Sequence, residues 1–128
     1  MLEQEPGVVL VVEDDEDIAH LLGYSLRKKR VPVAIAYDGL TAFALVEQLR
    51  PSLVLLDVML PRLDGYEVCR MIRSHADRNL AEIPVVMLSA LGAPEDIKKG
   101  LGSGANAYIA KPYSVKDVVV FTMEWLGL

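Results

Sequence analysis

Carboxylate, hydroxyl and ammonium side chains follow four separate apolar stretches of this 128-residue chain. In chain order they are Glu13, Asp14 and Asp15, then Asp57, then Ser89, and finally Lys111. Carboxylates that share one pocket repel each other unless a cation binds or some of them take up protons. Their oxygens suit Mg²⁺, which prefers oxygen ligands in octahedral geometry. A carboxylate nucleophile, Mg²⁺, a lysine and a hydroxyl together provide the positioning and charge neutralisation that phosphoryl transfer requires.

Each of these residues also has an ordinary structural explanation. Asp and Ser after a strand often cap the next helix or form a turn, and for Asp15 we favour capping. A lone lysine is usually solvated. The chemical interpretation therefore depends on all these residues together, because chance alone would have to place a suitable side chain after each of four separate strands. Zinc fits poorly, since no cysteine follows a predicted strand and His20 and His75 fall in or beside predicted helices.

Five short apolar runs alternate with amphipathic stretches, and we expect each run to form a strand. The runs cover residues 8–12, 31–36, 53–56, 85–88 and 107–110. Helical stripes cover residues 18–26, 42–49, 68–72 and 115–126, and a less regular stretch begins at Pro94. Continuous β-branched runs such as 8–12 are typical of strands buried on both faces. The pattern predicts an α/β fold, a doubly wound five-stranded parallel sheet with helices on either side.

In such a sheet, ligands bind beyond the carboxyl ends of the strands, where the strand order reverses. The polar residues named above follow the first, third, fourth and fifth predicted strands, so this rule places them at one side of the sheet. Two helix starts carry capping signals, because Asp64 is followed three residues later by Glu67, and Ser114 by Asp117.

The composition fits a single packed domain, and we expect residues 1–128 to form it, with 1–6 as an N-terminal extension. A formal net charge of −5 disfavours direct nucleic-acid binding. The basic run 27–30 falls where a helix should end, and there it balances the helix dipole.

One cysteine, Cys69, excludes an intrachain disulfide and fits a reducing compartment. With no apolar run near the ~20 residues of a membrane span, and no signal peptide, we expect a cytoplasmic protein that does not bind membranes.

Four segments are similar to the receiver (CheY-like) domain of bacterial two-component response regulators. They are residues 11–15, 55–65, 86–90 and 104–113, in the order and at the spacing of the family. The resemblance extends roughly from Pro6 to Leu126. It implies a flavodoxin-like (βα)₅ three-layer fold. It also implies a signalling switch that promotes its own phosphorylation and dephosphorylation, rather than an enzyme with an external substrate.

The resemblance implies a role for each residue of the acidic group. Asp57 corresponds to the phosphoacceptor. Asp57, Asp14 and Glu13 would hold Mg²⁺, with Mn²⁺ as an alternative, and Glu13 would more often act through water. Met59 would contribute only its backbone carbonyl to the metal.

The resemblance also implies how the switch is set and read. Ser89 and Lys111 would contact the phosphoryl group, Tyr108 would be the aromatic residue whose ring turns inward, and Pro112 would follow a cis peptide bond. The phosphoryl donor would be a phosphohistidine of a histidine kinase or a phosphotransfer protein. Phosphorylation would alter the surface of the fourth helix, fifth strand and fifth helix, which a downstream protein or a fused output domain would read.

The last predicted helix differs from that of many DNA-binding relatives in the family, because it has no arginine for an ion-paired dimer face. Val120 and Phe121 fall outside its core stripe, and Trp125 lies at the border. We hypothesise an apolar docking face there for a partner or a second copy of the chain. The alternative is that these residues are partly covered by a neighbouring helix or singly exposed.

Three other functions fit the same elements less well. A phosphatase with an aspartyl nucleophile needs Asp-x-Asp after the first strand, but Glu13 stands first there and Met59 cannot act as a general acid. A nucleotide- or flavin-binding module needs a glycine-rich turn where this chain has carboxylates. A receiver that has lost phosphorylation would not need the intact Asp57 and Lys111. Whether the chain is a stand-alone protein or part of a longer regulator stays open.

Overall fold

The computed structural model describes residues 7–128, and the predicted N-terminal extension 1–6 lies outside that range. Five parallel strands form one sheet in the order β2-β1-β3-β4-β5. They are β1 (Val9–Val12), β2 (Val33–Ala36), β3 (Leu53–Asp57), β4 (Val85–Ser89) and β5 (Ala107–Ala110). The predicted doubly wound parallel sheet is confirmed. β3 and β4 each extend one residue further than predicted, so Asp57 and Ser89 are the last residues of their strands.

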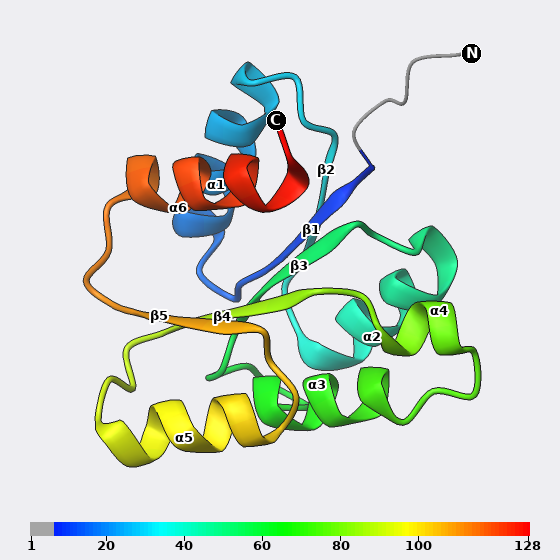
Figure 1. The fold of residues 1–128 in the computed structure, drawn as a ribbon. Coiled ribbons are helices and arrows are strands. Elements are labelled where there is room, and N and C mark those ends of the chain that lie inside the picture. The colour runs from blue at the N-terminus through cyan, green and yellow to red at the C-terminus, as the bar shows by residue number, and fades with distance from the viewer. Residues whose placement is uncertain (1–6) are drawn as a thin grey trace.

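Helices cover both faces of the sheet (Figure 1). They are α1 (Glu16–Lys28), α2 (Gly39–Leu49), α3 (Gly65–Arg73), α4 (Arg78–Ala81), α5 (Pro94–Gly102) and α6 (Val115–Leu126). α1 and α6 pack on one face, around a core that includes Leu22, Leu55 and Val118. The other helices lie on the opposite face, where Leu56 and Ile72 belong to a second core. Side chains alternate between the two cores along each central strand, as the continuous apolar runs predict.

The short helix α4 was not predicted, because four residues are too few to form an amphipathic pattern. Asp77 caps it by accepting a hydrogen bond from the Asn79 N–H at 2.9 Å, and Leu80 anchors it in the core at 1% exposure. The guanidinium of Arg73 in α3 donates to the carbonyl oxygens of Ala81 and Ile83 at 2.9 and 2.7 Å. These contacts hold the connection between α3 and β4 against the sheet.

Capping residues fix where the longer helices begin. Asp15 caps α1 as predicted, since its carboxylate accepts hydrogen bonds from two backbone N–H groups of the first turn. Asp64 and Glu67 form the predicted reciprocal capping box at the start of α3. The chain thus turns from strand to helix immediately beside the polar residues. Within residues 7–128, none of the helices has the length and apolar character needed to cross a membrane.

Candidate functional site

The three predicted acidic residues meet beyond the carboxyl ends of β1 and β3. Carboxylate oxygens of Glu13, Asp14 and Asp57 all lie within 4.8 Å of one another. Glu13 and Asp57 are almost fully buried, at 2% and 5% exposure, whereas Asp14 faces solvent. β1 and β3 are neighbours in the sheet, and the strand order reverses at this pair. The site therefore lies where the topology of a doubly wound sheet predicts it.

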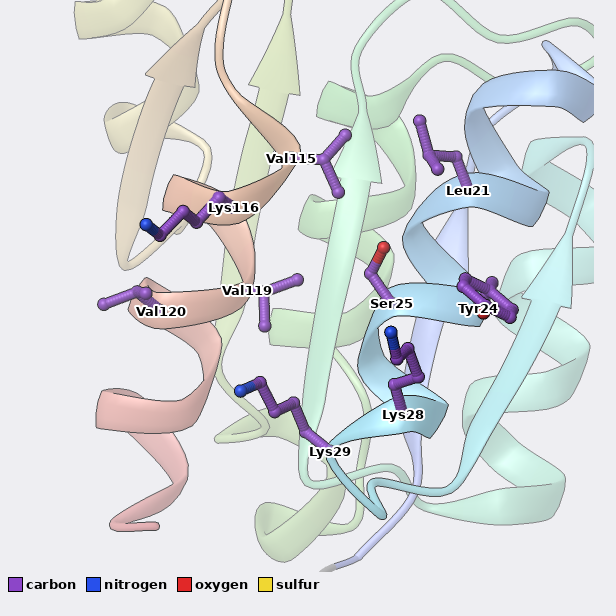
Figure 2. Close-up of a pocket in the computed structure, with 9 residues that line it drawn as sticks. All are labelled: Leu21, Tyr24, Ser25, Lys28, Lys29, Val115, Lys116, Val119 and Val120. Carbon is purple, nitrogen blue, oxygen red and sulfur yellow. The ribbon is translucent and has the colours of Figure 1, made fainter.

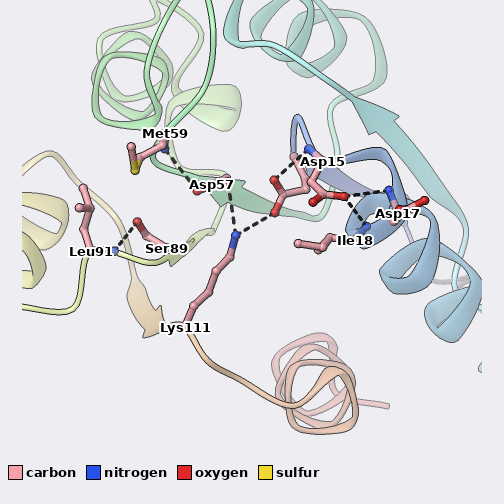
Figure 3. Close-up of polar contacts among 9 residues, drawn as sticks. Asp15, Asp17, Ile18, Asp57, Met59, Ser89, Leu91 and Lys111 are labelled. Atoms are coloured by element: carbon pink, nitrogen blue, oxygen red, sulfur yellow. Dashed lines mark hydrogen bonds and ion pairs between the residues drawn. The ribbon is translucent and has the colours of Figure 1, made fainter.

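Lys111 reaches this acidic cluster from the end of β5. Its ammonium nitrogen lies 3.2 Å from Glu13 Oε1 and 3.6 Å from Asp57 Oδ2. Figure 3 shows the lysine side chain extending from its strand toward the carboxylate of Asp57. One cation thus contacts both buried carboxylates, and the bond from Lys111 to Glu13 joins residues that are 98 positions apart in the sequence.

Charge repulsion and burial shift the pKa values of this cluster. Burial, followed by the neighbouring Asp57 carboxylate, raises the pKa of Glu13. The pKa of Asp14 is also raised, first by desolvation and then by Glu13. Burial of Lys111 opposes its charge, but the carboxylates of Asp57 and Glu13 outweigh this and raise its pKa. The cluster holds three carboxylates and one ammonium, and a divalent cation relieves the repulsion that this imbalance causes.

The backbone around Asp57 fixes the direction of its carboxylate. Asp57 Oδ1 accepts a hydrogen bond from the Met59 N–H at 3.3 Å (Figure 3). The Gly65 N–H donates to the carbonyl oxygen of Val58 at 2.8 Å, which brings the start of α3 against the strand end. A Cβ at Gly65 would lie 2.4 Å from the backbone oxygen of Asp57, so this approach requires glycine.

The predicted switch residues meet at the backbone of Leu91. The Leu91 N–H donates to Ser89 Oγ at 3.1 Å, and Ser89 itself is fully buried (Figure 3). The Tyr108 hydroxyl donates to the carbonyl oxygen of the same residue. The Lys111–Pro112 peptide bond is cis. Sequence reasoning named Ser89 and Tyr108 but missed their link through Leu91, because the link uses main-chain N–H and carbonyl groups that a side-chain pattern does not reveal.

A cleft of about 490 Å³ adjoins the acidic cluster. Among its lining residues are Asp14, Met59 and Leu91 near the strand ends, and Asp64, Tyr66 and Lys99 on the helix side. The Lys99 ammonium nitrogen lies 4.6 Å from the centroid of the Tyr66 ring. Neither residue was predicted as part of the site. Tyr66 directly follows the segment 55–65 of the resemblance, whereas nothing in the local sequence distinguishes Lys99 from Lys98.

The apolar residues of the hypothesised docking face lie on two flanks of α6. Val120 lines a groove of about 500 Å³ between α1 and α6, together with Leu21 and Tyr24 (Figure 2). Phe121 and Trp125 stack on each other, with ring centroids 5.7 Å apart, and do not line this groove. Successive helical residues point about 100° apart. Val120 and the Phe121–Trp125 pair are therefore two separate candidate surfaces.

Comparison with known proteins identifies the family. The family model described as "Response regulator receiver domain" matches residues 9–121, which is most of the chain. This chain is a response regulator receiver domain. It is accordingly a signalling switch of two-component systems, and not an enzyme that turns over a substrate.

Three known proteins illustrate what the receiver domain is similar to. It is 40% identical over 111 residues to the DNA-binding dual master transcriptional regulator RpaA of Synechocystis, covering 87% of this chain but 45% of that protein. The Francisella response regulator 1452 receiver domain matches with a TM-score of 0.86 at 28% identity, covering 94% and 97% of the two chains. The receiver domain of sensor histidine kinase PA1611 from Pseudomonas aeruginosa, with magnesium coordinated in its active-site cleft, matches with a TM-score of 0.84 at 30% identity, covering 96% and 99%. The chain spans about half the length of the curated relatives it matches.

Proposed function

We propose that the receiver domain is switched when Asp57 accepts a phosphoryl group from a histidine kinase or a phosphotransfer protein. The observation that supports this most directly is the buried Asp57 carboxylate, which lies 3.6 Å from the Lys111 ammonium and beside two further carboxylates. A carboxylate so placed lies at the carboxyl end of β3, and its charge is partly balanced by Lys111. Those are the requirements of a nucleophile that attacks a phosphorus atom.

The acidic cluster suits Mg²⁺, or Mn²⁺ as an alternative. Glu13, Asp14 and Asp57 offer hard oxygen ligands within 4.8 Å of one another, and the backbone carbonyl of Met59 is our proposed fourth protein ligand. The raised pKa values of Glu13 and Asp14 fit this proposal, because a divalent cation would relieve the repulsion that raises them. When bound, the metal would neutralise the oxygens of the incoming phosphoryl group. The magnesium-containing receiver domain of PA1611 supports the same assignment.

Asp57, Lys111 and Ser89 would carry out the transfer and bind the phosphoryl group. One Asp57 oxygen forms the new bond to phosphorus while the bond from phosphorus to the donor nitrogen breaks. Lys111 then pairs with a phosphoryl oxygen, since its ammonium already lies between Asp57 and Glu13. The Ser89 hydroxyl would donate to another phosphoryl oxygen.

Movement of Ser89 would carry the signal outward through Leu91. Ser89 Oγ now accepts from the Leu91 N–H, and Tyr108 donates to the Leu91 carbonyl. When Ser89 turns to the phosphoryl group, the segment 90–92 can follow it and release Tyr108. The ring of Tyr108 lies against Gly100 of α5, so its movement would reshape the surface formed by α5, β5 and α6. Such a switch requires only that a structural element has two conformations and that the charge of the phosphoryl group favours one of them.

That surface would be read by a partner. The similarity to DNA-binding regulators such as RpaA supports a fused output domain in a longer protein, and a separate downstream protein or a second copy of the chain are the alternatives. Phe121 and Trp125 offer an apolar contact on the flank of α6. With a net charge of −5, the domain itself would not contact nucleic acid. We place residues 1–128 in the cytoplasm as one receiver unit, with 1–6 as an extension.

Phosphorylation with acetyl phosphate and Mg²⁺ tests the assignment of Asp57. Wild type should gain one phosphoryl group by intact-mass spectrometry and bind beryllofluoride, whereas Asp57→Asn should do neither. Asp15→Asn is the matched control, because asparagine also caps α1 and the residue lies outside the acidic cluster. Equal responses of wild type and Asp57→Asn would refute the phosphoacceptor. Phosphotransfer from candidate histidine kinases then identifies the donor.

A further inference from the structure

The cleft beside the acidic cluster contains a cation that the proposed switch does not use. Among the described residues that line this cleft, Lys99 is the one basic residue. Asp14, Asp64 and Met59 line the same cleft, so Lys99 shares a space with one member of the acidic cluster. Lys111, by contrast, is already engaged with Glu13 and Asp57. The two lysines therefore serve different parts of the site.

The Lys99 side chain is exposed, and one contact between helices holds its ammonium at the cleft. It lies 4.6 Å from the centroid of the Tyr66 ring, a cation–π contact between α5 and α3. Tyr66 is itself fixed, being 5% exposed, with its hydroxyl 3.5 Å from the carbonyl oxygen of Asp96. Burial raises the pKa of Tyr66 to about 12, so its hydroxyl stays protonated and neutral. An ammonium that rests on a fixed ring is more restricted than a free surface lysine.

We propose that Lys99 binds the leaving group of acyl phosphates, small anionic donors that release a carboxylate. The inference depends on Asp57 being the phosphoacceptor. An Asp57 oxygen forms a bond to phosphorus while the bond between phosphorus and the acyl oxygen breaks, and the electron pair stays on the departing carboxylate without a proton transfer. Nucleophile and leaving group lie in line across the phosphorus atom, so the leaving group points out of the pocket. The cleft that Lys99 lines adjoins the acidic cluster at Asp14.

The charge of the leaving group provides the test. Lys99→Met keeps an apolar chain over the Tyr66 ring but removes the ammonium. We expect its phosphorylation rate with acetyl phosphate to fall roughly three- to tenfold, as loss of a nearby counter-charge predicts. Its rate with phosphoramidate, which releases neutral ammonia, should change by less than about twofold. Lys99→Arg should retain most of the acetyl phosphate rate.

Two controls separate this role from others. Lys98→Met removes the same net charge from the same helix but lies outside the cleft lining, so both of its rates should match wild type. Binding of beryllofluoride, which has no leaving group, should be unchanged in Lys99→Met. A loss that is equal for both donors, or no loss at all, would overturn the assignment of Lys99. If wild type reacts with neither donor, the phosphoacceptor itself is refuted, and this inference with it.

Discussion

Two strands that build the site differ in how firmly the fold holds them. β3, which ends in Asp57, lies at the centre of the sheet, and all five of its residues are buried. β5, which leads into Lys111 and carries Tyr108, lies at one side of the sheet, and its four residues are only partly buried. The proposed nucleophile thus lies on a fixed element, and the residues proposed to sense its charge lie on or beside one that can shift at lower cost. This division would allow a small chemical change to alter a surface without disturbing the core.

The largest expected effect is on stability, and it compares these two strands directly. Leu55→Ala in β3 removes a fully buried side chain and should lower the free energy of unfolding by about 2–5 kcal/mol. Ile109→Ala in β5 removes a partly buried one and should cost less than half as much. Urea unfolding monitored by circular dichroism measures both values. Equal losses would show that β5 is held as firmly as β3.

A second prediction concerns pH and the acidic cluster. The raised pKa values of Glu13 and Asp14 mean that the folded domain binds protons more readily than the unfolded chain. Their contribution to the stability of the metal-free domain is therefore present below about pH 4 and is lost as the pH rises through the raised values. Mg²⁺ replaces those protons, so the increase in Tm on adding Mg²⁺ should grow between about pH 4 and pH 7.

Differential scanning calorimetry with and without Mg²⁺ measures this dependence. Glu13→Gln should weaken it, because the glutamine carries no charge for the metal to neutralise, and Glu16→Gln on the exposed first turn of α1 is the control. A Mg²⁺ effect that is constant over the range would contradict the role of these carboxylates.

The smallest expected effect tests whether Tyr108 acts on the conformation of α5 and β5 without affecting phosphorylation. Tyr108→Phe removes the hydrogen bond to the Leu91 carbonyl and should lower stability by about 0.5–1.5 kcal/mol. Because Tyr108 touches none of the carboxylates in the described contacts, the rate of phosphorylation of Asp57 should stay near that of wild type. The chemical shifts of α5 and β5 should nevertheless move toward the phosphorylated form in the unphosphorylated variant. If Tyr108→Phe changed the phosphorylation rate but left the chemical shifts of α5 and β5 unchanged, Tyr108 would act in the chemistry and not in the response of the surface.

The sequence predicted the fold and the acidic cluster because both follow from patterns along the chain. Apolar runs define parallel strands, and residues at their carboxyl ends must then converge, as Glu13, Asp57 and Lys111 do. α4 escaped prediction because its stability comes from Asp77 and Leu80 rather than from a repeating stripe.

Contacts between helices also could not be predicted from the sequence. The approach of Lys99 to Tyr66 depends on how α5 lies against α3, and no local pattern encodes that angle. Val120 and Phe121 were grouped because both fall outside the core stripe of the last predicted helix, but the placement of α1 beside α6 gives them different surroundings. Side-chain roles that depend on packing between elements require the three-dimensional structure.

The hydrogen bonds at Leu91 have a consequence for how this receiver can evolve. Both bonds, to Ser89 and from Tyr108, use the peptide groups of this residue and leave its side chain out of the connection. Nineteen of the twenty amino acids supply the same N–H and carbonyl, and proline alone lacks the N–H. Position 91 can therefore diversify and change the wall of the cleft, while the two hydrogen bonds that form the proposed connection from phosphoryl group to surface are kept.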